Sequence, residues 1–226
     1  MILQKKTLRR ALALLCALVM ITSLCAVSAC AWAAPGYTPP AALTALWQKN
    51  HDVIAGIVIP GTDLCYPIMQ HEQDDYYLNI CFDGTEGYPG SIYTNKVEGK
   101  EFSTFNTVIY GHNMRDGSYF GCLRNYLDPE FFASHREIDI FTAGAKHVYD
   151  VFAVVIYGDR RITDLFDDSK PADRTAFLES LKQCGEDGIL MADIPVNTEG
   201  HIITLSTCVS DMHDNRLLVV AAERGA

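Results

Sequence analysis

The sequence predicts a mainly β fold, an antiparallel barrel or sandwich that carries a few helices. Three observations support this class. Short runs rich in β-branched residues recur along the chain, turn-forming residues separate these runs, and helical apolar periods are confined to a few segments. Roughly 190 of the 226 residues follow an apolar N-terminal segment, which is enough for one domain with a sizeable core.

The strand signals begin with a hairpin. Residues 53–59 form a β-branched run, residues 60–63 read PGTD as in a turn, and a second strand is expected at 64–69. Further strands are expected at 91–94, 107–110, 138–142, 147–157, 201–207 and 216–222. A polar loop separates the last two of these strands.

Two helices are expected between the later strands. The first lies within 116–134, where Asp128 suits the N-cap and Pro129 the first helical position. The second spans 170–184 and starts near Pro171. Its apolar face comprises Phe177, Leu181 and Cys184. Gly185 is expected to terminate the helix.

The N-terminus combines a basic cluster with a long apolar run. Residues 1–10 hold four cations, and residues 11–34, a run of 24, hold no charged side chain. A helix of that length can cross a hydrocarbon core of about 30 Å. We therefore expect a cytoplasmic basic tail at 1–10 and a transmembrane signal anchor at 11–34, with the remaining chain outside the cell.

Two other fates of this segment stay open. Residues 31–33 (AWA) resemble a signal-peptidase site, which would release the protein. Residues 27–30 (VSAC) resemble a lipobox, which would anchor an exported lipoprotein through Cys30. In each case residues 35–52 are expected to form a Pro/Gly linker and a short helix. That helix would be capped by Thr38 and present the apolar face Leu43, Leu46 and Trp47.

Charge and cysteine usage exclude several classes of protein. The net charge of −10 argues against nucleic acid as a partner, because phosphate binding needs clustered Lys and Arg. None of the eight cysteines forms a CxxC pair, which argues against a zinc ribbon or a thioredoxin-type motif. Five cysteines follow the apolar segment, and this odd number points to a reactive thiol, an intermolecular bridge or simply buried reduced side chains. No motif predicts a cofactor or a metal.

The candidate nucleophile is Cys208. It closes the strand of segment 204–208 (TLSTC), and Arg216 opens the next strand eight positions later. If the two strands pair through the loop at 209–215, the thiol and the guanidinium lie near each other at one end of the barrel. A thiolate can attack a carbonyl, while a fixed guanidinium favours the thiolate and stabilises an oxyanion.

Such a cysteine needs a histidine to handle the proton. His112 is the first candidate, because it follows the strand at 107–110 in a glycine-containing turn. His213 competes with it, lying five positions from Cys208. A metal site built on Cys208 and His213 has no second pair at ligand spacing to support it.

These residues resemble the motifs of class B sortases. Segment 204–208 matches the TLxTC signature, and Arg216 stands where the family has its active-site arginine. Segment 110–114 (YGHNM), followed by Asp116, Gly117, Ser118 and Phe120, is similar to the histidine segment of class B. Segments 57–62 (IVIPGT) and 66–68 (YPI) resemble the first hairpin of the family, and segment 90–93 (GSIY) resembles the strand that precedes the histidine segment. Five segments in the right order, between Val53 and Glu223, make the resemblance specific.

The resemblance implies an eight-stranded barrel, an N-terminal helix and a helix in the connection before the cysteine strand, with 53–226 as the catalytic domain. It implies that Cys208 attacks the carbonyl of a Thr in a sorting signal and forms a thioester, that His112 protonates the leaving amine, and that Arg216 orients the substrate and stabilises charge. Four residues are assigned to substrate binding, with structural roles in the turn or strand end as the alternative: Tyr110, Asn113, Ser206 and Thr207.

The resemblance also implies the partners. They are surface proteins that carry a sorting signal, and an amino group of cell-wall peptidoglycan, or of a pilin, that resolves the thioester. Water can resolve it when the amine is absent. The rival function is a non-catalytic binding module on a sortase-like barrel. A papain-like hydrolase is not favoured, because there the cysteine precedes the histidine and starts a helix, whereas here His112 comes before Cys208, which ends a strand.

Overall fold

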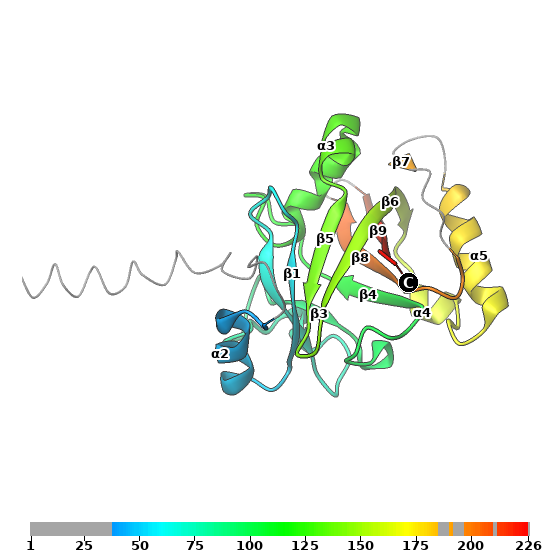
Figure 1. The fold of residues 1–226 in the computed structure, drawn as a ribbon. Helices are drawn as coiled ribbons and strands as arrows, with labels where there is room; N and C mark the ends of the chain where they lie inside the picture. The colour runs from blue at the N-terminus through cyan, green and yellow to red at the C-terminus, as the bar shows by residue number, and fades with distance from the viewer. Residues whose placement is uncertain (1–37, 185–189, 192–196, 210–211, 226) are drawn as a thin grey trace, which may run out of the picture.

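A computed structural model describes residues 38–184, 190–191, 197–209 and 212–225, and it contains a closed β-barrel (Figure 1). The described strands follow the order β5-β1-β2-β3-β4-β8-β9-β6-β7, and pairing of β5 with β6 closes eight of them into the barrel. The ninth, β7, pairs with β6 outside this ring. The strands are β1 (Val53–Val58), β2 (Cys65–Gln70), β3 (Ile92–Thr94), β4 (Asn106–Tyr110), β5 (Glu137–Phe141), β6 (Lys146–Gly158), β7 (Leu190–Met191), β8 (Ile202–Val209) and β9 (Met212–Glu223).

The predicted eight-stranded barrel is therefore confirmed, and each predicted strand is present within a few residues of its expected bounds. The expected antiparallel pairing is wrong for two pairs of strands, because β2 pairs with β3 and β4 pairs with β8 in parallel. Neither parallel pair is joined by a tight hairpin. A long connection separates β2 from β3, and three strands lie between β4 and β8 in the chain, as parallel pairing requires.

The N-terminal helix, α2 (Ala41–Lys49), begins later than predicted. Its N-cap is Pro40, whose carbonyl accepts from the Thr44 N–H at 3.0 Å, so the expectation that Thr38 caps the helix is wrong. The two prolines that follow Thr38 explain the difference. A residue before a proline disfavours the helical conformation, so the helix can begin only after Pro40.

The two interior helical regions match their predictions more closely. Within 116–134 lie η4 (Phe120–Leu127) and α3 (Pro129–Ser134), separated by Asp128. The Asp128 carboxylate accepts from the N–H groups of Glu130 and Phe131 at 2.7 and 3.2 Å, as expected of an N-cap. The third predicted helix appears as α5 (Pro171–Lys182), after a short α4 (Ile162–Leu165); Gly185 lies outside the described residues.

Side chains along each strand alternate between two faces. One set fills the barrel interior, and the other set packs against the helices outside it. Along β9, Leu217, Val219 and Ala221 point into the barrel core, whereas Leu218 and Val220 face outward. Phe177 of α5 packs on these outward residues, and its full burial is worth about 1.5–3 kcal/mol. On the opposite side of the barrel, Leu43 of α2 covers the outer face of β1 and β2 (Figure 1).

No helix among the described residues has the length and apolarity needed to cross a membrane. The anchor expected at 11–34 lies outside these residues.

Two short helical turns, η2 (Tyr76–Leu78) and η3 (Lys96–Glu98), were not predicted, and η3 buries an acid. Glu98 is 2% exposed. Burial raises the pKa of its carboxyl from 4.5 to about 8, even though the Val108 N–H hydrogen-bonds to it.

Glu98→Gln should change how stability depends on pH. The folded protein keeps a proton on Glu98 that the unfolded chain releases near the ordinary pKa of 4.5. The resulting stabilisation is complete below that pH and is lost as the pH rises through about 8. Urea denaturation should therefore show wild-type stability falling relative to the variant by on the order of a few kcal/mol over this window. Glu199→Gln, an exposed control, should leave the curve unchanged, and parallel curves for Glu98→Gln would contradict the assignment.

Candidate active site

The pairing of β8 with β9 brings the predicted thiol and guanidinium together. Cys208 and Arg216 are direct cross-strand partners, so their side chains leave the sheet on the same face. The Arg216 Nη1–H donates to the Cys208 Sγ, and the thiol is exposed. Both residues lie slightly inside their strands rather than at the ends, because β8 continues to Val209 and β9 already begins at Met212.

The thiol lies on the outer surface of the barrel. Leu205 and Leu217 point into the core, whereas Ser206 and Cys208 alternate with them and face outward. The interior is filled by apolar side chains, so it offers no room for a substrate. The chemistry is therefore confined to the outer face.

His112 follows β4 in a turn that is tied to the cysteine strand. The parallel register sets Tyr110 beside Ser206, and the Gly111 N–H donates to the Ser206 carbonyl at 3.3 Å. The Thr207 hydroxyl donates a hydrogen bond to the Gly111 carbonyl at 2.7 Å. Position 111 must be glycine, since a Cβ there would lie 2.7 Å from the Phe120 ring.

The imidazole of His112 contacts a segment of the chain outside β4 and β8. Its Nε2 lies 3.1 Å from the Leu78 carbonyl oxygen, which can only accept, so Nε2 carries the proton in this bond. The Tyr88 ring lies over the imidazole with the ring centroids 4.9 Å apart. Both contacts come from the connection between β2 and β3, which carries η2.

The four residues assigned to substrate binding differ in their placement. Asn113 donates from Nδ2 to the Cys208 carbonyl at 2.8 Å, and Thr207 bonds Gly111, so both brace the site from within the protein. Tyr110, Ser206 and Thr207 line the groove beside the thiol, whereas Asn113 is not among its lining residues. Tyr110 stacks on Tyr93, and burial raises the pKa of its phenol far above the ordinary value.

A groove of about 190 Å³ joins these residues. His112, Cys208 and Arg216 line it together, so the structure gathers the three predicted catalytic residues at one place. The side chain of the competing His213 lies outside the described part of the chain. No group of three or more potential metal ligands occurs among the described residues.

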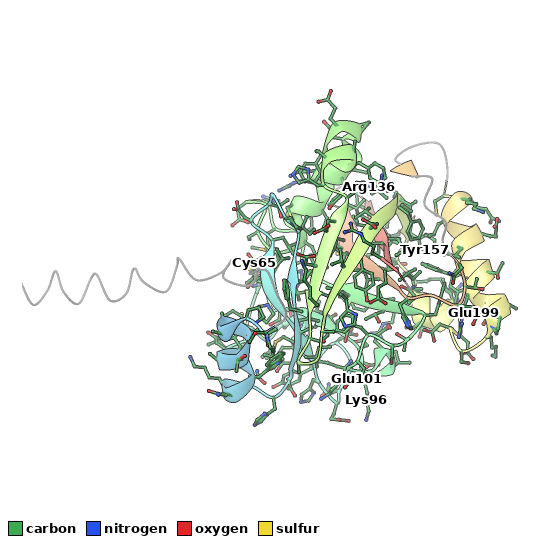
Figure 2. All side chains as sticks on the ribbon, viewed as in Figure 1. Cys65, Lys96, Glu101, Arg136, Tyr157 and Glu199 are labelled. Carbon is green, nitrogen blue, oxygen red and sulfur yellow. The ribbon has the colours of Figure 1, made fainter. Side chains whose placement is uncertain are left out.

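Sequence reasoning missed the wall of the groove across from β8. This wall includes Asp75 and Leu78 near η2, and Tyr157, Arg161 and Ile162 at the corner between β6 and α4. Tyr157, labelled in Figure 2, lies between the barrel and α5, and its hydroxyl is 2.8 Å from Ser180 Oγ. These residues form no local motif. They come from segments whose proximity depends on barrel closure.

The chain is similar in sequence and in fold to proteins of one known family. A family model described as the sortase domain matches residues 57–224. Sortase B of Listeria monocytogenes is 32% identical over 164 residues, which cover 72% of this chain and 65% of that protein. The crystal structure of sortase B from B. anthracis in complex with AAEK1 superposes with a TM-score of 0.70 at 32% identity, covering 80% of this chain and 83% of that one.

A Streptococcus pyogenes class B sortase involved in pilus biogenesis also superposes, with a TM-score of 0.68 at 27% identity, covering 80% of this chain and 97% of that one. The fold and the site define the protein as a closed β-barrel with an exposed cysteine thiol on its outer face. The chain belongs to the sortase family, and the relatives it matches are class B sortases.

Thr207→Val should test the bond that ties the histidine turn to the cysteine strand. The substitution keeps the side-chain volume but removes the hydroxyl of the buried Thr207 from the Gly111 carbonyl. We expect the free energy of unfolding to fall by about 1–2 kcal/mol in urea denaturation. Thr175→Val removes an exposed hydroxyl on α5 and should change stability by less than about 0.5 kcal/mol. Equal effects would mean that the bond contributes nothing.

Proposed function

We propose that this protein is a sortase B-type cysteine transpeptidase. One observation carries the proposal: an exposed Cys208 thiol accepts a hydrogen bond from the Arg216 guanidinium in the groove that His112 also lines. Nucleophile, cation and proton donor are the groups that acyl transfer through a thioester requires. Similarity to class B sortases supports the same activity.

In the proposed reaction, Cys208 Sγ attacks the carbonyl carbon of the Thr residue in a sorting signal. The peptide C–N bond breaks, and the proton held by His112 leaves with the amine. The acyl group stays on Sγ as a thioester. An acceptor amine then attacks the thioester carbonyl, a new amide forms, and Sγ departs while the amine proton passes to His112. Arg216 stabilises the oxyanion in both steps.

The same proposal covers the partners and the location. The donors are exported proteins with a C-terminal sorting signal, and the acceptor is an amino group of cell-wall peptidoglycan or of a pilin. The S. pyogenes relative acts in pilus biogenesis, which motivates the second acceptor. Residues 11–34 would anchor the enzyme in the cell membrane as a single pass, with residues 53–226 as the extracellular catalytic domain.

The rival function, a non-catalytic binding module on the same barrel, is not favoured. The relatives of this chain are sortases, and the chain has a cysteine, a histidine and an arginine that line one groove. A binding module would have no need for an exposed thiol beside a guanidinium.

Cys208→Ala should abolish cleavage of a sorting-signal peptide while leaving the fold intact, because no thioester can form. The measurement is cleavage of a panel of quenched fluorescent sorting-signal peptides by the full-length protein in detergent micelles. Wild-type cleavage of one peptide would also identify the recognised motif. Activity that survives in Cys208→Ala would refute the proposed nucleophile.

His112→Ala should lower the cleavage rate by about 10²–10⁴-fold, the usual loss for a missing general acid. His213→Ala is the matched control and should stay close to wild type, with both folds checked by circular dichroism. If His213→Ala loses the activity and His112→Ala keeps it, the proton donor has been assigned to the wrong histidine.

A further inference from the structure

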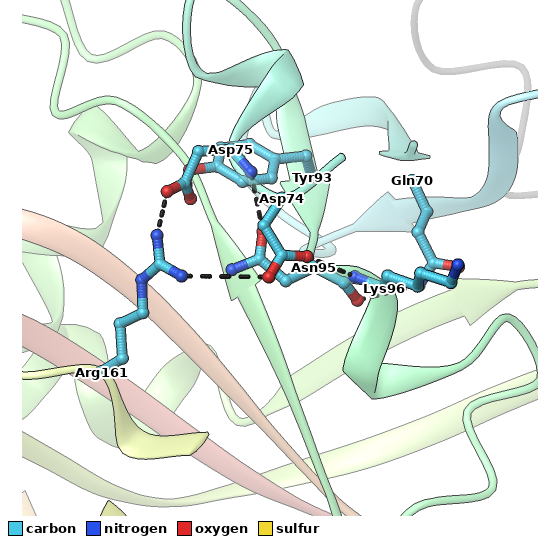
Figure 3. Close-up of polar contacts among 7 residues, drawn as sticks. All are labelled: Gln70, Asp74, Asp75, Tyr93, Asn95, Lys96 and Arg161. Atoms are coloured by element: carbon cyan, nitrogen blue, oxygen red, sulfur yellow. Dashed lines mark hydrogen bonds and ion pairs between the residues drawn. The ribbon is translucent and has the colours of Figure 1, made fainter. Parts of the chain in front are cut away.

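A second polar cluster lines the groove, across from the thiol. Arg161, at the corner between β6 and α4, donates from Nη2 to the Asp75 carboxylate, 86 positions away in the chain (Figure 3). Its Nη1 lies 4.0 Å from Asp74 Oδ2. Asp75 and Arg161 line the same groove as His112 and Cys208. The ion pair therefore joins the η2 segment to the corner between β6 and α4 within the wall across from β8.

Asp75 is held in place by more than its ion pair. Its backbone φ is 57°, in the left-handed region that aspartate and asparagine tolerate better than most residues. The Asp75 N–H donates to Asn95 Oδ1 at 3.1 Å. One carboxylate oxygen accepts from the Tyr93 hydroxyl at 3.1 Å and the other from Arg161. Because its N–H and both carboxylate oxygens are hydrogen-bonded, the backbone and side chain of Asp75 are held in one position in the groove (Figure 3).

The same turn reaches the catalytic histidine. Asp75 is the residue before η2, and its carbonyl accepts from the Leu78 N–H at 3.0 Å. The Leu78 carbonyl in turn lies 3.1 Å from His112 Nε2. On its other side this carbonyl packs so closely on Gly90 that a Cβ there would lie 2.3 Å away. A single helical turn thus connects the ion pair to the imidazole.

We propose that Asp75 and Arg161 are a positioning pair for His112. The pair fixes η2 against the corner between β6 and α4, and η2 presents the Leu78 carbonyl that orients the imidazole. Neither side chain is assigned contact with the reacting atoms. Both are more than a third exposed, at 36% for Asp75 and 39% for Arg161, so the ion pair adds little to global stability. Its effect should therefore appear in the site rather than in unfolding.

The kinetic test rests on the proposed function and uses Asp75→Asn and Arg161→Gln in the full-length protein. Asparagine keeps the tolerance for the left-handed backbone and an oxygen for Tyr93 but removes the charge. We expect kcat for peptide cleavage to fall about tenfold in each variant, with KM changed less than about twofold. Arg161→Lys, which keeps the charge, should recover part of the loss. The double variant should be no worse than either single variant, because both break one interaction.

Glu72→Gln is the matched control. It makes the same kind of change three residues before Asp75 and breaks an exposed ion pair with Lys96 outside the groove. It should leave kcat and KM at wild-type values. A rise in KM with unchanged kcat in Asp75→Asn would overturn the proposal, because it would assign the pair to substrate binding instead.

A measurement independent of turnover separates this proposal from the proposed function. The ¹⁵N NMR signals of the His112 imidazole should report one tautomer, with the proton on Nε2, in the wild type and in Glu72→Gln. Asp75→Asn and Arg161→Gln should both show a mixture of tautomers. Unchanged His112 signals in these two variants would overturn the positioning role. If the wild type cleaves no peptide, the proposed function fails while the NMR result still decides this inference.

Discussion

The lateral hydrogen bonding of β8 is the constraint on which the site depends. On one edge β8 pairs in parallel with β4, which sets Tyr110 beside Ser206. On the other edge it pairs antiparallel with β9, which sets Cys208 beside Arg216. A slip of one residue in either register would turn the facing side chains to the opposite surface of the sheet. The thiol therefore has its neighbours because the register of this one strand is set on both edges.

The apolar core explains why the site lies outside the barrel. Alternate side chains of every long strand fill the interior, and the outward set needs cover of its own. Helix α5 covers one part of the outer surface and α2 another, on opposite sides of the barrel (Figure 1). The groove occupies the outer face at the end of β4 and β8, where Tyr110 and Leu218 line it together with the polar groups.

Local hydrogen bonds then hold the loops in the geometry that the sheet defines. The Thr207 hydroxyl donates a hydrogen bond to the Gly111 carbonyl in the histidine turn, and the Asn113 side chain of that turn donates one to the Cys208 carbonyl. These two bonds hold the turn and the cysteine strand together. The imidazole is held separately through Leu78, which belongs to neither segment. The site thus combines a rigid pair on adjacent strands with a histidine whose orientation depends on a third part of the chain.

Features that depend on neighbours in the chain could be predicted from the amino-acid sequence. The strand runs, the cap at Asp128 and the signature around Cys208 were all readable, because turn chemistry and side-chain period act over a few residues. The N-cap expected at Thr38 was wrong for a reason that was also local, namely the prolines at 39 and 40. The tertiary structure alone decided the parallel pairing of β4 with β8 and the meeting of Asp75 with Arg161 across 86 positions. Such contacts form only when the barrel closes, because sheet register and core packing, rather than any local preference, bring distant segments together.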